Sequence, residues 1–247
     1  MVCFTSVRSQ QYITPSIGYS LAFFSSDDLD LFKDTYNSFH RSFQFGLIKG
    51  FSGLSQPVGI RLELGYHHFG KLAMFANVGF QNVFTKDFAE FDNFEERELI
   101  LRQRSFLIEG GIGPRIKQFF ITGVFAVYFN KKLSLESSYR APPDPEGANP
   151  LNGKYESNNT ISTDFGISVG VNKDPVILTL KLMYPLFTGG KNEVLTDDNL
   201  AKIAAGTSVF PDNFESSFFN EPYKGIKSNI DGFKIILTLG IPLQVRE

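Results

Sequence analysis

The sequence predicts an all-β fold: an antiparallel up-and-down transmembrane β-barrel of about 8 to 10 strands with long extracellular loops. The first observation is an alternation of apolar and polar side chains along Val58 to Phe69, which is typical of a strand with one apolar face. The second is its resumption from Leu72 after Gly70-Lys71, which predicts a hairpin. The third is the recurrence of such hairpins along the chain, as in Ile161 to Phe187.

The amino-terminal third contains two further predicted strands and one segment with helical spacing. Tyr12 to Phe24 alternates as a strand and ends in a polar cluster. Asp28 to Phe39 has apolar residues at helical spacing and predicts a helical turn within a loop. Phe39 to Lys49 alternates again and predicts a second strand, whereas the charged stretch Thr85 to Arg97 after the first hairpin predicts a loop.

The remaining strands are predicted from the same two-faced pattern, with Asn130-Lys131 interpreted as a turn between two of them. They are Leu99–Arg115, Phe119–Phe129, Leu133–Arg140, Ile161–Val171, Val176–Phe187 and Phe233–Leu243. Counting Phe39 to Lys49 gives a barrel of about ten strands, and an even number is the rule in bacterial barrels. Ten is therefore favoured, and eight, by merging two of the middle segments, is the alternative.

The composition fits a membrane barrel and excludes several other classes. The 24 basic and 26 acidic residues nearly balance, which argues against a nucleic-acid partner. A membrane helix would need roughly 18 consecutive apolar residues, and no such run occurs. The 27 Phe and 9 Tyr, with no Trp, would have to form the aromatic girdles of a barrel. The alternative is a soluble sandwich with a core rich in Phe.

Residues 1–9 are expected to be the remnant of a secretory signal, and residues 10–247 a single outer-membrane β-barrel domain. The single cysteine, Cys3, excludes an internal disulfide and a cysteine-based zinc cluster. A lipoprotein with Cys3 lipidated is a further alternative, but the apolar stretch that lipidation requires does not precede it.

Several charged or titratable residues fall on the predicted inward face and form a candidate lumen charge network. They are Arg61, Glu63, His67, Glu109, Arg115, Glu136, Arg140, Asp164, Lys181 and Lys234. One interpretation is a salt-bridged plug that fills a narrow barrel, because about eight strands leave an interior only wide enough for side chains. The other is a selective pore for ions or small solutes. Near-balanced signs favour the plug.

The sequence predicts no enzyme, no metal site and no cofactor. The three histidines are badly spaced for a metal, and no Gly-x-Ser-x-Gly elbow is present. A hydrolase built into the barrel wall is the remaining enzymatic alternative. Gly110-Gly111-Ile112-Gly113 lacks the Lys-Ser/Thr of a phosphate loop, and its small residues instead suit a bulge or a bulky lumen neighbour.

Two long polar segments, Ala141 to Asn159 and Thr188 to Asp231, predict surface loops with a binding role. In the second, Asp197 to Ala205 has the composition of a short helix. Four aromatic residues that follow are expected to contact a partner, either another envelope protein or a glycan. These four are Phe210, Phe214, Phe218 and Phe219.

The chain resembles the small outer-membrane β-barrel proteins of Bacteroidetes-type bacteria. The likeness rests on Phe32–Asn37 (FKDTYN), the hairpin Gly65–Gln81, Arg97–Leu101 (RELIL) and Leu151–Tyr155 (LNGKY). It implies a location in the outer membrane of a Gram-negative bacterium, with the lipid bilayer as first partner. The chain departs from the usual aromatic end of such barrels, because it finishes Gln244-Val245-Arg246-Glu247. The expected function is that of a structural or binding component of an envelope complex; the alternative is a narrow, porin-like channel.

Overall fold

The computed structural model describes residues 10–24, 27–41, 46–92, 94–140, 153–156, 159–188, 193–194, 196–197, 227–228 and 231–245. Its elements, in chain order, are β1 (Gln10–Phe23), α1 (Asp27–Arg41), β2 (Leu47–Lys49), β3 (Val58–Phe69), β4 (Leu72–Phe91), β5 (Glu96–Ile116), β6 (Phe119–Arg140), β7 (Gly153–Glu156), β8 (Thr160–Lys173), β9 (Val176–Thr188), β10 (Glu193–Val194), β11 (Thr196–Asp197), β12 (Lys227–Ser228), β13 (Phe233–Gly240) and β14 (Leu243–Gln244).

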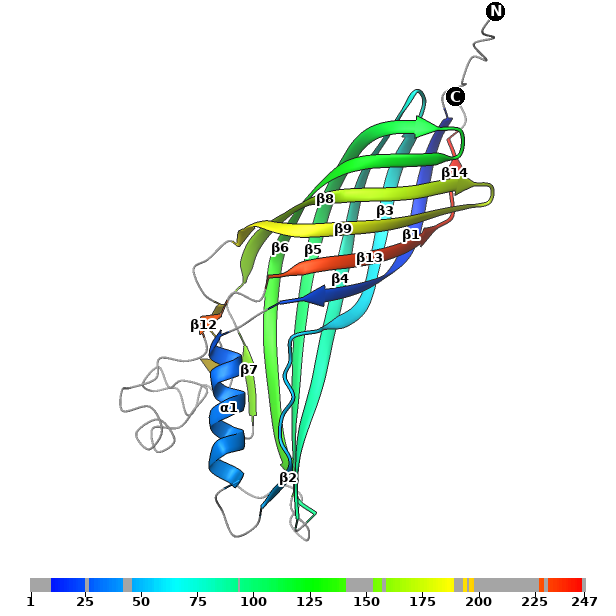
Figure 1. Cartoon of the computed structure of the whole chain (residues 1–247). Coiled ribbons are helices and arrows are strands. Elements are labelled where there is room, and N and C mark those ends of the chain that lie inside the picture. The colour runs from blue at the N-terminus through cyan, green and yellow to red at the C-terminus, as the bar shows by residue number, and fades with distance from the viewer. Residues whose placement is uncertain are drawn as a thin grey trace, which may run out of the picture.

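The long strands close into a ring of antiparallel neighbours (Figure 1). The order around the ring is β1, β3, β4, β5, β6, β8, β9 and β13, and β13 pairs back onto β1. Closure leaves no unpaired edge within the ring, as a membrane span requires. The structure thus confirms the predicted all-β up-and-down transmembrane barrel. The first residues of β1 and the strand β14 lie on the side of the short turns (Figure 1).

Eight strands close the ring in the described part of the chain, so the favoured count of ten is wrong and the lower alternative holds. Two segments account for the difference. Within the segment 39–49, residues 39–41 end α1 and residues 47–49 form the short strand β2, which pairs with β4 at Leu47 and Phe91, outside the ring. Residues 119–129 and 133–140 are a single strand, β6.

The join within β6 is a β-bulge at Asn130, where a turn was predicted. Towards β5, the pairing passes from Phe106 and Phe129 to Arg104 and Lys132, so β6 carries one residue more than its partner. The same extra residue appears on the β8 side. Asn130 has φ of 51°, a left-handed conformation that Asn tolerates better than most residues. Because side chains alternate, the extra residue exchanges the two faces of β6 beyond it.

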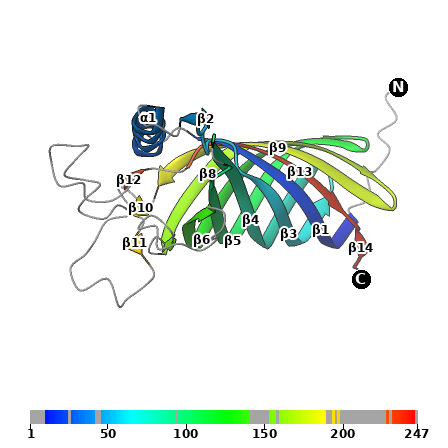
Figure 2. The same ribbon diagram turned by 90° about the horizontal axis from the view of Figure 1, so that it is seen from below.

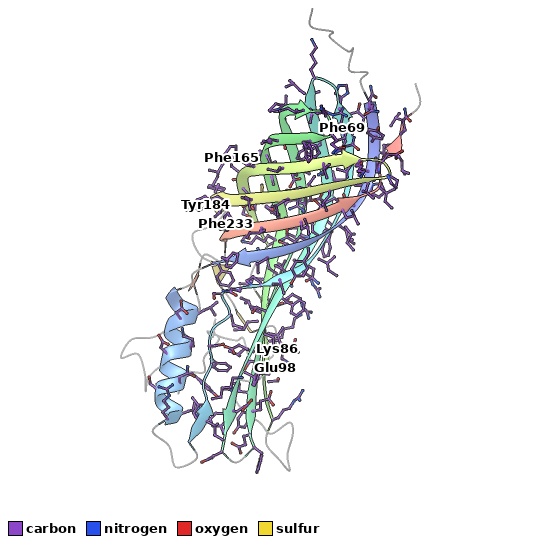
Figure 3. The ribbon with its side chains drawn as sticks, turned by 45° about the vertical axis from the view of Figure 1, so that its right-hand side comes forward. Phe69, Lys86, Glu98, Phe165, Tyr184 and Phe233 are labelled. Carbon is purple, nitrogen blue, oxygen red and sulfur yellow. The ribbon has the colours of Figure 1, made fainter. Side chains whose placement is uncertain are left out.

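The outward face of the ring is apolar. Every ring strand places large apolar side chains outward, and many are about half exposed, as a lipid-facing surface requires. Phe165, Tyr184 and Phe233 lie on this face near its far rim (Figure 3). Phenylalanine and tyrosine therefore supply the aromatic residues at this rim in a chain without tryptophan.

Strands β4, β5 and β6 continue beyond the apolar face as a three-stranded extension, so the segment 85–97, predicted as a loop, is mostly strand. β4 runs to Phe91 and β5 starts at Glu96 (Figure 1). One side of the extension packs on α1 and on the segment 50–57, with α1 lying beside β2 (Figure 2). The helix predicted within a loop is therefore present as α1. We call this extension, with α1 and residues 46–57, the platform.

The platform has its own hydrophobic core. Its buried members are Phe24, Leu29, Tyr36, Phe51, Leu54, Ala89, Phe91, Leu99, Leu101, Leu133 and Leu135. Two polar anchors fix the segment 50–57 on this core. Asn37 bonds both the N–H and the carbonyl of Phe51, each at 2.9 Å, and the Asp87 carboxylate accepts from the N–H groups of Ser52 and Gly53, each at 2.7 Å. Within the described residues, no helix is long and apolar enough to cross a membrane.

We expect acid to loosen α1 through His40. Its ring packs on Tyr36, with centroids 4.3 Å apart, and on Phe91, at 5.1 Å. Burial, and secondly the positive charge of Arg97, lower the pKa of His40 to about 4. The unfolded chain, with a histidine pKa near 6.5, therefore binds the proton first, and stability falls as the pH falls from about 6.5 to 4. Above that window the group contributes no pH dependence.

The measurement is hydrogen exchange of the α1 amides between about pH 7 and about pH 4. It is compared with a His40→Phe variant, which keeps a ring and cannot titrate. Wild type should lose protection in α1 more steeply than the variant over this range. Parallel curves for the two proteins would contradict the assignment to His40.

Candidate functional site

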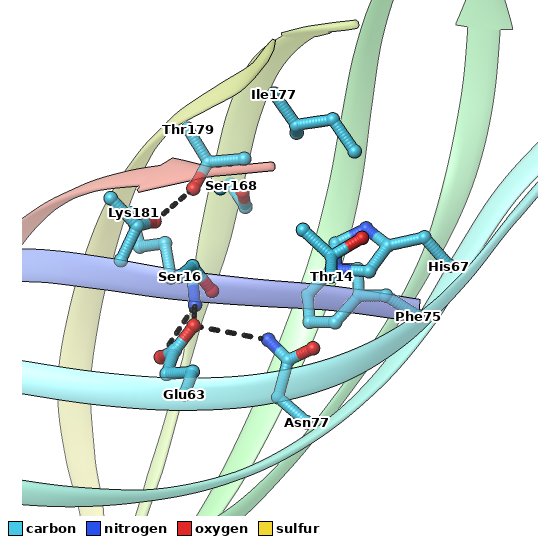
Figure 4. A pocket seen from close by; sticks show the side chains of 12 residues that line it. Thr14, Ser16, Glu63, His67, Phe75, Asn77, Ser168, Ile177, Thr179 and Lys181 are labelled. Atoms are coloured by element: carbon cyan, nitrogen blue, oxygen red, sulfur yellow. Dashed lines mark hydrogen bonds and ion pairs between the residues drawn. The ribbon is translucent and has the colours of Figure 1, made fainter. Parts of the chain in front are cut away.

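Two acids and two bases meet at mid-height of the barrel lumen. β3 contributes Arg61 and Glu63, β5 contributes Glu109 and β9 contributes Lys181, all fully or almost fully buried. Arg61 pairs with both carboxylates, and Lys181 pairs with both as well, at 3.1 Å from Glu63. Asn77 donates to the same carboxylates, at 3.3 Å to Glu63 and 3.1 Å to Glu109. Figure 4 shows Glu63 between Asn77 and Lys181.

A second group of four charges lies next to the first and is joined to it by Tyr128. Lys234 pairs with Asp164 at 2.7 Å, and Lys131 pairs with Asp231 at 2.9 Å. The Tyr128 hydroxyl is 3.2 Å from the Arg61 guanidinium, and the Lys234 ammonium lies 4.2 Å from the centre of the Tyr128 ring. Each group holds two positive and two negative side chains, so the buried charge is balanced within each.

Towards the short turns, apolar and aromatic side chains occupy the lumen. Phe69, Ala73, Phe120 and Ile177 form a buried apolar cluster, with Tyr12 packed against it. Between this cluster and the charges lies a cavity of about 10 Å³, room for the centre of about one water molecule, lined in part by His67 and the hydroxyls of Thr14 and Thr179 (Figure 4). Buried side chains thus occupy the lumen at several successive levels.

The structure brings together most of the residues predicted for the lumen. Arg61, Glu63, His67, Glu109, Asp164, Lys181 and Lys234 are all buried inside the ring. Arg115 lies instead at the rim with the short turns, where it donates to the carbonyl of Phe69 at 3.0 Å and to that of Lys117 at 2.7 Å.

Glu136 and Arg140 do not reach the lumen. Both are exposed on the outer face of the platform. The bulge at Asn130 is the physical reason, because it turns Leu133 and Leu135 inward and their neighbours outward. The extra residue of a bulge leaves the alternation of each half intact, so the pattern alone does not reveal the exchange.

The prediction missed four members of the network. Tyr128 lies in a nearly continuous apolar run, Lys131 was assigned to a turn, and Asp231 to the end of a loop. Asn77 is on the polar face of the first hairpin, and its position in that alternation was the signal that could have identified it.

The glycine run of β5 serves packing in the lumen. A Cβ at Gly111 would lie 2.4 Å from the ring of Phe75, so glycine makes room for that ring. The run is therefore part of a strand beside a bulky lumen neighbour, one of the two roles predicted for it.

Other predicted features lie outside the described residues. These are the segment 1–9, most of the loops 141–159 and 188–231, the helix expected from Asp197 to Ala205 (of which only Asp197 is described, in β11), and Phe210, Phe214, Phe218 and Phe219. Among the residues that are described, no group of three His, Cys, Asp or Glu is placed to hold a metal ion.

Comparison with known proteins assigns no family to this chain. No protein-family model and no curated protein sequence matches the chain. Among solved structures, one that matches is Ail, the attachment invasion locus protein of Yersinia pestis, in complex with the heparin analogue sucrose octasulfate. The match has 10% sequence identity and a TM-score of 0.40, and it covers 96% of this chain and 99% of Ail.

Proposed function

We propose that this chain is an outer-membrane protein of a Gram-negative bacterium that acts as a binding component of the cell envelope. The observation that carries the proposal is the contrast between the two halves of the molecule. The lumen is filled by balanced, buried charges, whereas β4 to β6 continue past the apolar face and form a platform with its own core. A rigid platform outside the lipid suits recognition of a partner.

The platform also contacts described parts of the two long connections, 141–159 and 188–231, in which the binding residues are expected. β6 ends at Arg140, where the segment 141–159 begins, and β7 from that segment pairs with β6. β11, from the segment 188–231, in turn pairs with β7. Both long connections are thereby tied to one side of the barrel. We propose that they present the contact surface, including Phe210, Phe214, Phe218 and Phe219, to another envelope protein or a glycan.

The channel alternative is disfavoured by the arrangement of the lumen charges. Arg61, Glu63, Glu109 and Lys181 satisfy one another, and a permeating ion would have to displace them against their mutual attraction. A barrel-wall hydrolase is also disfavoured, because the lumen histidine, His67, stacks on Phe75 with ring centroids 5.7 Å apart and is buried.

Deleting Leu195 to Tyr223 should abolish retention of the partner and leave the barrel folded. The measurement is crosslinking in intact cells followed by purification of the full-length and deleted chains, with the heat-dependent gel shift of barrels as the folding check. Deletion of 141–152 is the matched control, because it shortens the other long connection. Loss of the folded band in the first deletion would mean that the segment belongs to the core and that the binding role is wrong.

Planar-bilayer recordings on the purified wild-type chain separate binding from conduction. The plug predicts no steady conductance. Steady, ion-selective steps that change when Arg61 or Lys181 is neutralised would establish the channel instead.

A further inference from the structure

The outward face of β4, β5 and β6 carries a row of three phenylalanines near the platform. Phe80 faces Phe106 across the strands, with ring centroids 5.4 Å apart, and Phe106 stacks on Phe129 at 6.0 Å. An open groove of about 450 Å³ runs beside them, and Leu62, Leu64 and Val78 complete its apolar lining. The groove faces outward within the apolar surface of the ring, so a hydrocarbon chain can lie in it.

Basic side chains lie next to this row of phenylalanines, on the side of the platform. Arg104 follows Phe106 on the same face of β5, and its cross-strand neighbour on β6 is Lys132, which the bulge at Asn130 turns outward. Arg102 lies two residues further along β5, on the same face and opposite Phe84. Like charges placed directly opposite each other on neighbouring strands are destabilising unless an anion lies between them.

These cations are incompletely satisfied by the part of the chain that the structure describes. The side chain of Arg104 has no hydrogen bond or ion pair with any described residue, and the buried Nε of Arg102 has no hydrogen-bond partner there. Lys132 pairs with Glu156, which it shares with Lys154. An exposed guanidinium beside a second one, above an apolar groove, suits a phosphate group, because guanidinium forms two parallel bonds to phosphate oxygens.

The acidic neighbours do not cancel this charge. In the four rows of β4 to β7 beyond the phenylalanines, the basic side chains are Lys86, Arg102, Arg104, Lys132 and Lys154, and the acidic ones are Glu98, Glu136 and Glu156. Glu98 pairs with Lys86, and Figure 3 shows both on the platform. Two positive charges remain, although the whole chain has a net charge of −2.

The cluster is confined to one sector of the rim. On the other ring strands, the outward residues at this rim are apolar or aromatic, among them Phe23, Val58, Phe165, Phe187 and Phe233. The groove along Phe80, Phe106 and Phe129 lies in the same sector as the basic rows. A general attraction to anionic lipid would not require the basic cluster and the apolar groove to lie in the same sector.

We propose that this sector binds a lipid whose headgroup carries a phosphate. The phosphate lies between Arg102, Arg104 and Lys132, and one acyl chain lies in the groove beside Phe80, Phe106 and Phe129. The site goes beyond the proposed binding role, and it is independent of the partner of the long connections.

Native mass spectrometry of the full chain in non-ionic detergent tests the proposal with phosphatidic acid and with diacylglycerol of the same acyl chains. Phosphatidic acid should bind at least about tenfold more tightly, because each charge-assisted hydrogen bond contributes roughly 1.5–3 kcal/mol. The triple variant Arg102→Gln, Arg104→Gln, Lys132→Gln should lose that preference. Arg140→Gln, which removes an exposed charge further along β6, is the matched control and should keep it.

Inorganic phosphate provides the third arm. It should displace phosphatidic acid only at concentrations far above those of the lipid, because it cannot occupy the groove. Equal binding of the two lipids, an unchanged preference in the triple variant, or displacement by phosphate at concentrations equal to the lipid would each overturn the proposal. Thermal unfolding in the same detergent, without lipid, should show the triple variant close to wild type, because it loses the like-charge contact of Arg104 with Lys132 as well as the exposed pair of Lys132 with Glu156. That result separates a lost site from a lost fold.

Discussion

Replacing Glu109 by Gln is expected to destabilise the barrel by about 3–5 kcal/mol, the cost of leaving a buried charge without its partner. Glu109 is 1% exposed and accepts from both Arg61 and Lys181. Without its charge, these two cations face Glu63 alone, and the first group of lumen charges gains one net positive charge. Glutamine keeps the shape of the side chain, so the loss reports on charge more than on packing. Urea unfolding of the barrel in lipid vesicles is the measurement.

The compensated variant decides whether charge balance is the cause. Lys181→Met in the Glu109→Gln background restores neutrality and leaves the pair of Arg61 and Glu63, so the double variant should be more stable than the Glu109→Gln single variant. Glu136→Gln is the matched control, because Glu136 is exposed on the platform and its neutralisation should change stability by less than about 0.5 kcal/mol. Additive losses in the double variant would show that the four side chains do not act as a unit.

The alternation of side chains was sufficient to predict the barrel and most of its lumen. Along β3 the period of two holds from Val58 to Phe69 without interruption, so the inward positions of Arg61, Glu63 and His67 follow from the sequence. The same holds for Asp164 on β8 and Lys181 on β9. The alternation could not predict which charges pair with each other, because pairing across the lumen depends on the register of strands far apart in the chain.

The platform was largely missed for a different physical reason. Residues 85–97 are rich in charge, and such a stretch resembles a loop when it is considered alone. In the structure, Asp87 and Arg97 are both buried. Asp87 accepts hydrogen bonds from Ser52 and Gly53. Arg97 donates hydrogen bonds to Tyr36 and Ser137. Partners distant in sequence compensate these polar groups, and local sequence does not report them.

Deleting Asn130 and Lys131 together is expected to destroy the platform while the membrane-spanning ring remains folded. Loss of Asn130 alone would remove the bulge and leave every later side chain on its present face. Loss of both residues places Lys132 directly after Phe129, so every side chain from Lys132 onward changes face. Leu133 and Leu135, now buried in the platform core, would point outward, and Lys132 and Glu136 would point into it. Losing the burial of two leucines costs roughly 2–5 kcal/mol each by analogy with leucine truncations, and burying the two charges adds to that.

Limited proteolysis with the heat-dependent gel shift as a parallel readout distinguishes the two parts of the molecule. The variant that lacks both residues should be cut within the platform at protease concentrations that leave wild type intact. Its ring should still remain folded in detergent when the sample is not heated. Asn130→Gly is the matched control, because glycine adopts a φ of 51° without strain and keeps the extra residue, so it should behave as wild type. Asn130→Val should lie between them, with a cost of about 1–2 kcal/mol for a branched side chain in the left-handed region. If the variant lacking both Asn130 and Lys131 kept a protease-resistant platform, the alternation of side chains beyond the bulge would not be what places Leu133 and Leu135 in the core, and the outward position of Lys132 beside Arg104 would lose its explanation.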